Sequence, residues 1–169
     1  FSNETGQKIL GNLKKSPHFY NYSQRTVGDF FSEVREHGLA SAWQDASAWG
    51  QMRMSPTDLA DVRYDAFLVN GQTNDQNWTG IFQPGERVRL RFINASAMSM
   101  YDVRIPGLQM TVIQADGQYI EPVTVDEFRF AVAETYDVIV TPQADQAYTI
   151  AAESIDRTGF ALGTLAPRE

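Results

Sequence analysis

The sequence predicts a mainly β protein, an antiparallel β-sandwich or barrel that carries an N-terminal helical appendage. After about residue 60 the apolar residues recur at every second position, and turn residues separate many short candidate strands, as is typical of antiparallel sandwiches and barrels. Before that point the apolar residues recur at the spacing of a helix. We expect one compact domain, with a lead-in and helical appendage over residues 1–60 and the sandwich over residues 61–169.

Two helices and a short third are expected in the N-terminal part. The first has one apolar stripe with the spacing i, i+3, i+4, i+7, formed by Val27, Phe30, Phe31 and Val34. Thr26 can cap this helix and Gly38 can end it. A capping box that begins at Ser41 predicts the start of the second helix, and residues 55–58 predict the first turn of the third. Residues 1–23 predict an extended or partly helical lead-in.

The second part of the chain is expected to be strands joined by turns. The candidate strands are residues 64–69, 88–92, 101–105, 110–115, 128–132, 136–141, 148–153 and 161–165. Turn pairs lie between them at Asn70-Gly71, Pro106-Gly107 and Asp116-Gly117. Residues 72–80 are polar and predict a loop. Many short strands at this spacing favour an antiparallel sandwich or barrel.

Charge and hydropathy exclude several classes of partner. The formal net charge of −7 argues against a nucleic acid. No apolar run approaches the roughly 20 residues of a membrane-spanning helix. The opening residues lack the basic start and apolar stretch of a signal peptide. Because the chain opens on Phe1 without Met, we expect a fragment of a longer polypeptide.

The candidate metal ligands are few. A type 1 copper site uses a Cys thiolate and two His imidazoles, but the sequence has no Cys and only two His, His18 and His37. Thioether sulfur is a ligand for Cu(I), and two Met-x-Met pairs offer it, namely Met52 with Met54 and Met98 with Met100. If residues 98–100 were in a strand, the second pair would share one face. The alternative is that these Met side chains fill gaps in the core.

Other polar groups point to no single reaction. A glycosidase pair could come from six carboxylates, but the sequence cannot place two of them across a substrate as that chemistry requires. They are Asp116, Glu121, Asp126, Glu127, Glu134 and Asp137. Arg87, Arg89 and Arg91 alternate along one predicted strand, either as a solvated face or as a docking face for another domain. Four Asn-x-Ser/Thr triplets begin at Asn3, Asn21, Asn77 and Asn94. A third possibility is an interaction or carbohydrate-binding module that uses exposed aromatic residues such as Trp78.

Long stretches of the sequence resemble one known family. The segments "RTVGDFFSEVREHG", "FLVNGQT", "NWTGIFQPGERVRLRFINASAM" and "AETYDVIV" resemble the middle cupredoxin-like domain of bacterial copper-resistance multicopper oxidases of the CopA type. The resemblance runs from about residue 6 to residue 167. "PGERVRLRFINAS" and "AETYDVIV" are similar to the general three-domain oxidase pattern, and residues 24–60 point to the copper-resistance branch.

The resemblance implies a cupredoxin-like sandwich inside a three-domain periplasmic enzyme. In that family the type 1 copper lies in the third domain, the trinuclear copper cluster lies between the first and third domains, and the middle domain holds no copper ligand. The implied partners are therefore the first and third cupredoxin domains of the same chain, which hold the copper cofactors. The parent would oxidise a substrate, with Cu(I) the expected one, and reduce O2 to water. This fragment alone would hold no cofactor, be inactive, and space the other two domains.

The resemblance also implies a missing edge. In the family an apolar strand precedes the segment "ETGQKILGNLKK" and begins the middle domain, whereas this sequence begins at Phe1, after that strand. Because an exposed strand edge pairs readily with another chain, we expect the fragment to form a homodimer through that edge.

Overall fold

The computed structural model of the protein describes residues 1–14, 27–51, 62 and 64–168. The chain divides into two compact units. One consists of Tyr64–Glu169 together with Phe1, and the other of Ser2–Arg63.

The unit of residues 2–63 is helical in its described part. Its helices are α1 (Gly6–Leu13), α3 (Val27–His37) and α4 (Leu39–Gln51). Thr5 caps α1, because its side-chain oxygen accepts a hydrogen bond from the backbone N–H of Lys8 at 3.4 Å. The expectation of a partly helical lead-in is therefore confirmed.

Helices α3 and α4 meet at a glycine. Gly38 has a φ of +84°, and its N–H donates to the carbonyl oxygen of Val34 at 3.0 Å, which ends α3 as expected. The carbonyl of Gly38 then accepts from the N–H of Ala42, so α4 begins before Ser41. The capping box predicted at Ser41 is wrong, because that residue lies inside the helix. Ala42 of α4 is fully buried. Phe31, which belongs to the apolar stripe of α3, is 65% exposed, so that stripe is only partly covered within the described residues.

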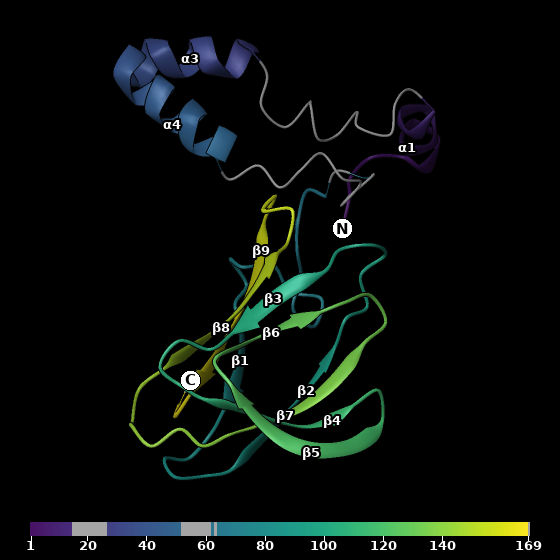
Figure 1. Ribbon diagram of the computed structural model, residues 1–169, viewed down its shortest axis with the longest axis vertical. Helices are drawn as coiled ribbons and strands as arrows, with labels where there is room; N and C mark the ends of the chain where they lie inside the picture. Colours follow the sequence, from purple (N-terminus) through teal and green to yellow (C-terminus); the bar gives the residue numbers. More distant parts are fainter. Residues whose placement is uncertain (15–26, 52–61, 63, 169) are drawn as a thin grey trace. The chain divides into compact units, whose positions relative to one another are not determined.

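The larger unit is a β-sandwich, as Figure 1 shows. The five-stranded sheet has the order β1 (Trp78–Ile81), β9 (Phe160–Ala166), β8 (Tyr148–Ser154), β3 (Tyr101–Arg104) and β6 (Glu127–Phe130). The four-stranded sheet has the order β2 (Val88–Ile93), β7 (Thr135–Val140), β4 (Met110–Ala115) and β5 (Gln118–Val125). The predicted mainly β fold is confirmed. All pairs are antiparallel except β1 with β9, which are parallel.

Three local predictions are wrong. Residues 64–69 do not form a strand and contribute only an isolated bridge between Val69 and Gln72. The end of the predicted loop at residues 72–80 is strand β1, and β5 was not predicted at all. The turn at Asn70-Gly71 is confirmed, because both residues have positive φ values of 49° and 79°.

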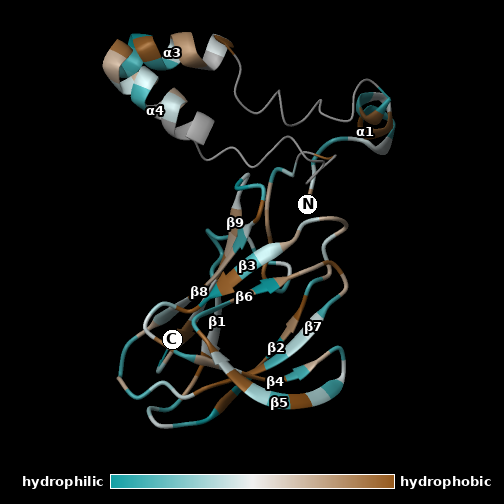
Figure 2. Cartoon of the chain, in the orientation of Figure 1, coloured by the Kyte–Doolittle hydropathy of each residue, from teal (hydrophilic) through white to brown (hydrophobic). Residues whose placement is uncertain are grey.

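A single apolar core lies between the two sheets. Its buried members are Phe82, Ile105, Met110, Val112, Val138, Val140, Tyr148, Ile150 and Leu165. They come from both sheets and from the segments that join them, so the core holds the sandwich together. An aromatic cluster of Phe92, Phe128, Phe130 and Tyr136 adds edge-on ring contacts, with centroids of Phe128 and Tyr136 5.3 Å apart. Figure 2 shows hydrophobic stretches along the strands and hydrophilic residues in many of the loops.

Candidate functional site

The second Met pair lies in the loop between β2 and β3. Met98 is half-buried, Ser99 between them is buried, and Met100 is 36% exposed. The pair is therefore not on a strand, and the expectation that a strand would put both sulfurs on one face does not apply. Met52 and Met54 lie outside the described residues.

The loop that carries Met98 and Met100 is held by Asn94. Asn94 is 4% exposed, and its side-chain amide donates to the carbonyl oxygens of Ser99 at 2.9 Å and Phe130 at 3.1 Å. Its side-chain oxygen accepts from the N–H of Ser96 at 3.0 Å and from the hydroxyl of Ser96 at 2.6 Å. The side-chain amide nitrogen of Asn94 is buried and donates two hydrogen bonds. The Asn-x-Ser triplet that begins at Asn94 therefore belongs to a structural loop and is not an accessible glycosylation site.

Arg89 and Arg91 of the predicted Arg row lie on β2, whereas Arg87 precedes the strand, and Arg89 holds a buried carboxylate. Asp137 on β7 is 7% exposed, and Arg89 donates to it through Nε at 2.8 Å and also through its Nη2. Arg91 approaches the same carboxylate at 3.6 Å. The hydrogen bond to Asp137 is the main cause that raises the pKa of Arg89 above its ordinary value. Arg89 and Arg91 therefore form an ion-pair network with Asp137 across the sheet.

The other carboxylates are used in turns and surface pairs. Asp116 accepts from the N–H of Thr135 at 2.8 Å, and Glu134 accepts from the N–H of Ala131 at 2.6 Å. Glu127 pairs with Arg104 at 3.8 Å. Among the described residues no cluster of three or more His, Cys, Asp or Glu side chains is suited to a metal ion. The carboxylates described here stabilise local structure, and their contacts do not point to acid–base chemistry.

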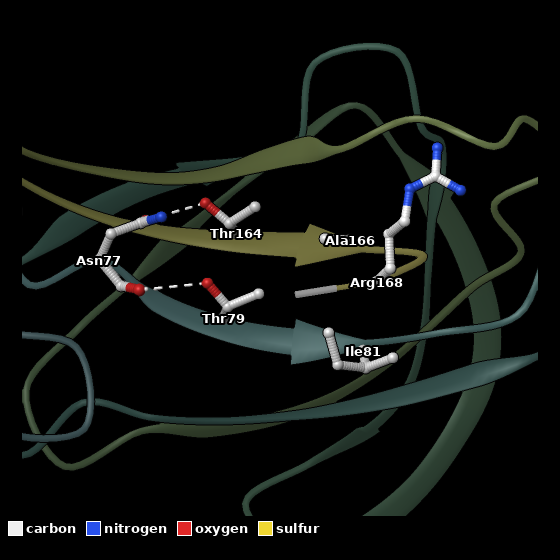
Figure 3. A pocket seen from close by; sticks show the side chains of 6 residues that line it. All are labelled: Asn77, Thr79, Ile81, Thr164, Ala166 and Arg168. Atoms are coloured by element: carbon white, nitrogen blue, oxygen red, sulfur yellow. Dashed lines mark hydrogen bonds between the residues drawn. The ribbon is translucent and has the colours of Figure 1, made fainter.

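Two hollows lie on the sandwich. The first, shown in Figure 3, is lined by Asn77, Thr79, Ile81, Thr164, Ala166 and Arg168. Asn77 accepts from the hydroxyl of Thr164 at 2.8 Å through its side chain and from the hydroxyl of Thr79 at 3.2 Å through its backbone. The second is lined by Gly107, Leu108, Gln109, Thr111, Thr124, Ile139, Thr141, Gln143, Ala144 and Tyr148. Neither lining contains a His, Cys, Asp or Glu, so neither offers a nucleophile–base pair.

Trp78 does not provide an exposed aromatic platform. It is half-buried and packs against the core. A Cβ placed on Gly163, its partner in register on β9, would lie 3.1 Å from the Trp78 ring, and one placed on Gly80 would lie 3.0 Å from it. The ring therefore lies close over two glycines. The expectation that Trp78 is exposed for glycan binding is wrong, because its ring takes up space that these glycines leave open.

The donor atoms present do not fit the copper centres of an oxidase. The whole sequence has no thiolate ligand. His37 lies in the last turn of α3, and His18 lies outside the described residues. A type 1 site needs a thiolate and two imidazoles at one place. A chain without a cysteine cannot supply that thiolate. In the part of the chain that the structure describes, none of the helices has the length and apolar character needed to span a bilayer.

Known proteins share this sequence over most of its length. Residues 25–166 match the sequence model of the multicopper oxidases. This chain belongs to the multicopper oxidase family. Copper resistance protein A of Escherichia coli is 58% identical over 171 residues, which cover 100% of this chain and 28% of the relative. The protein of the same name from Pseudomonas syringae pv. tomato is 54% identical, with the same coverage. The chain thus spans about 28% of the length of these curated relatives.

Solved structures agree with this family. The crystal structure of laccase from Botrytis aclada has a TM-score of 0.51 at 28% identity and covers 55% of this chain and 19% of the laccase chain. The multicopper oxidase from Pseudomonas Thermotolerans has a TM-score of 0.51 at 25% identity and covers 64% of this chain and 27% of its own. The predicted resemblance to copper-resistance multicopper oxidases and the predicted cupredoxin-like sandwich are both confirmed.

Proposed function

We propose that this chain is the middle cupredoxin-like domain of a periplasmic copper-resistance multicopper oxidase, and that it spaces and orients two neighbouring domains without binding copper itself. The observation that carries the proposal is that a chain of this family has no cysteine at all, although its whole length aligns with copper resistance protein A. A family member without the thiolate cannot hold the type 1 centre, so that centre would lie elsewhere in the longer polypeptide.

The sandwich has the properties that a spacer needs. Its core joins both sheets, and the buried Asn94 and Asp137 side chains have specific hydrogen-bond partners. Such packing keeps the geometry of a domain fixed. Electron transfer and a copper cluster shared between two domains demand a fixed separation, so a rigid domain between them supports catalysis without contacting the substrate.

The parent would oxidise Cu(I) and reduce O2 to water, with both reactions at copper centres in the first and third domains of the same chain. We also propose that residues 1–60 form a helical appendage of the sandwich at residues 61–169, within one domain. The relatives named for copper resistance support this assignment, since they share the full length of this chain.

The Met-based alternative can be separated from the spacer role in the full-length polypeptide. Met98→Leu with Met100→Leu keeps the side-chain volume and removes both thioethers. The spacer role predicts unchanged copper content, measured by metal analysis, and unchanged oxidase activity. A loss of bound Cu(I), with the unfolding midpoint preserved, would contradict it and would identify the β2–β3 loop as a copper-handling site.

A further inference from the structure

Phe1 belongs to the sandwich, although the helical unit follows it directly in the chain. Its amino group donates to the carbonyl oxygen of Ala66 at 2.9 Å, and its own carbonyl oxygen accepts from the N–H groups of Asp65 at 2.9 Å and Ala66 at 3.3 Å. Phe1 and Ala66 thus exchange hydrogen bonds in both directions, as opposite residues of an antiparallel pair do, with Cα atoms about 5.5 Å apart. The chain therefore leaves the sandwich at Phe1 and returns to it beside the same point.

The segment to which the chain returns is packed into the sandwich by aromatic rings. The ring of Tyr64 meets the ring of Phe67 edge-on, with centroids 6.2 Å apart, and Phe67 meets Tyr101 of β3 in the same way at 6.1 Å. The ring of Phe67 also fills the space beside Gly159, where a Cβ would clash with it. Both ends of the helical unit are therefore attached to a well-packed part of the sandwich.

The core of the sandwich is built from the sandwich itself. Among the described residues, every buried core member and every half-buried apolar side chain packed on the core lies between Trp78 and Leu165. The helical unit has an interior of its own, since α3 and α4 pack against each other and Ala42 of α4 is fully buried. Because the burial of apolar surface is the main favourable term in folding, a sandwich with its own core does not need the helical unit in order to fold.

We propose that residues 2–63 are an insertion, attached at the Phe1–Ala66 pair, in a sandwich that folds without them. This inference rests on the proposed function and narrows it, because the spacer is then the sandwich alone and not the helical unit. A long insertion at a closed pair of residues costs little, since the entropy of closing a loop rises only with the logarithm of its length. Proteins accept inserted segments at surface sites whose two ends lie close together, and the Phe1–Ala66 pair meets that condition.

Excision of residues 2–63 from the 169-residue chain tests the insertion directly, with a four-residue Gly-Ser linker joining the two cut ends. Trp78 is then the only tryptophan left, so its fluorescence reports the unfolding of the sandwich. The reference is the intact chain with Trp43→Phe and Trp49→Phe, in which Trp78 is also the only tryptophan. The urea midpoint of the excised chain should equal that of the reference or exceed it, because a shorter loop loses less entropy on closing. An excised chain that does not fold, or that has a lower midpoint, would overturn the proposal.

A matched pair of substitutions at fully buried positions gives a second test that needs no excision. Ala42→Asp places a charge inside the helical unit, and Val138→Ala opens a cavity in the core of the sandwich. In the same reference chain, Val138→Ala should lower the urea midpoint that Trp78 reports. Ala42→Asp should leave that midpoint unchanged while it reduces the helical circular-dichroism signal. A lower Trp78 midpoint for Ala42→Asp would show that the two units unfold together and would contradict the insertion.

The same excision in the full-length polypeptide tests whether the spacer is the sandwich alone. The copper content, measured by metal analysis, should be unchanged, because the sandwich that remains keeps the neighbouring domains at their separation. Loss of copper from the excised full-length polypeptide would show that the helical unit takes part in spacing and would overturn the narrowed assignment. Tight Cu(I) binding by the 169-residue chain would instead contradict the proposed function and leave the insertion standing, so the two failures are distinguishable.

Discussion

Individual polar residues in this domain serve the fold, and Asn94 is the clearest case. The four hydrogen bonds of its side chain fix the loop between β2 and β3 to itself and to the end of β6. Sequence reasoning found Asn94 only as the first residue of a glycosylation triplet. The signal was ambiguous because a buried Asn and a glycosylated Asn share the same short pattern.

Asn94→Asp is predicted to destabilise the sandwich by about 1–3 kcal/mol, because the buried carbonyl oxygens of Ser99 and Phe130 lose the Asn94 amide as a donor and face a carboxylate in its place. Urea unfolding measures this loss. Asn77→Asp is the control, since Asn77 is exposed and its side chain acts there as an acceptor, which aspartate keeps. An equal loss in both variants would contradict the role of the Asn94 amide.

Gly159 is a second position where one residue type is required. A Cβ built on it would lie 2.4 Å from the ring of Phe67. Gly159→Ala is therefore predicted to cost about 1–3 kcal/mol through overpacking, measured as a lower unfolding midpoint. Gly11 in α1 has no atom within 4 Å of the same position, so Gly11→Ala should be neutral or slightly stabilising. A neutral Gly159→Ala would show that Phe67 moves aside without cost.

At the scale of elements, the β2–β7 pair combines an apolar inner side with an ionic outer side. Arg89 and Arg91 occupy neighbouring outward positions but differ in their contact with Asp137. Arg89→Met should lower the urea midpoint several-fold more than Arg91→Met, because it removes the close donors of a buried carboxylate. The Arg91 pair is longer and more exposed, and such pairs contribute little. Equal shifts would show that the two arginines share the carboxylate.

The strands that sequence reasoning predicted are those whose alternation is strong. Residues 110–115 coincide with β4, and residues 88–92 lie within β2, because one face of each packs on the core. Strand β5 was missed although its turn, Asp116-Gly117, was found with φ values of 46° and 79°. Its sequence has no clean alternation, because most of it is exposed and Pro122 interrupts it. Strand β1 was missed because its parallel pairing with distant β9 leaves no local signal.

The candidate site was predictable only in part. The sequence shows that no thiolate is present, and this observation decided against a type 1 copper site. The contacts of Asp137 and the half-buried position of Trp78 depend on residues far apart in the chain, so local patterns could not predict them. The expected homodimer through a missing N-terminal edge stays a prediction. Phe1 makes three backbone hydrogen bonds with Asp65 and Ala66.

At the scale of the whole molecule, the proposed contribution of this domain to the parent oxidase is its rigid shape. It belongs to an oxidase family, but its polar side chains stabilise turns, loops and one ionic face. A rigid domain of this kind would keep its neighbours at a fixed separation.

The measurement that tests this account most directly is an anaerobic Cu(I) titration of the 169-residue chain against a competing chelator, followed by metal analysis and a visible spectrum in air. The account predicts that no copper is retained and that no blue absorption appears, because two isolated Met pairs without a thiolate make a poor site. Tight, stoichiometric Cu(I) binding that Met98→Leu with Met100→Leu abolishes would contradict it, and would make this domain a participant in copper handling.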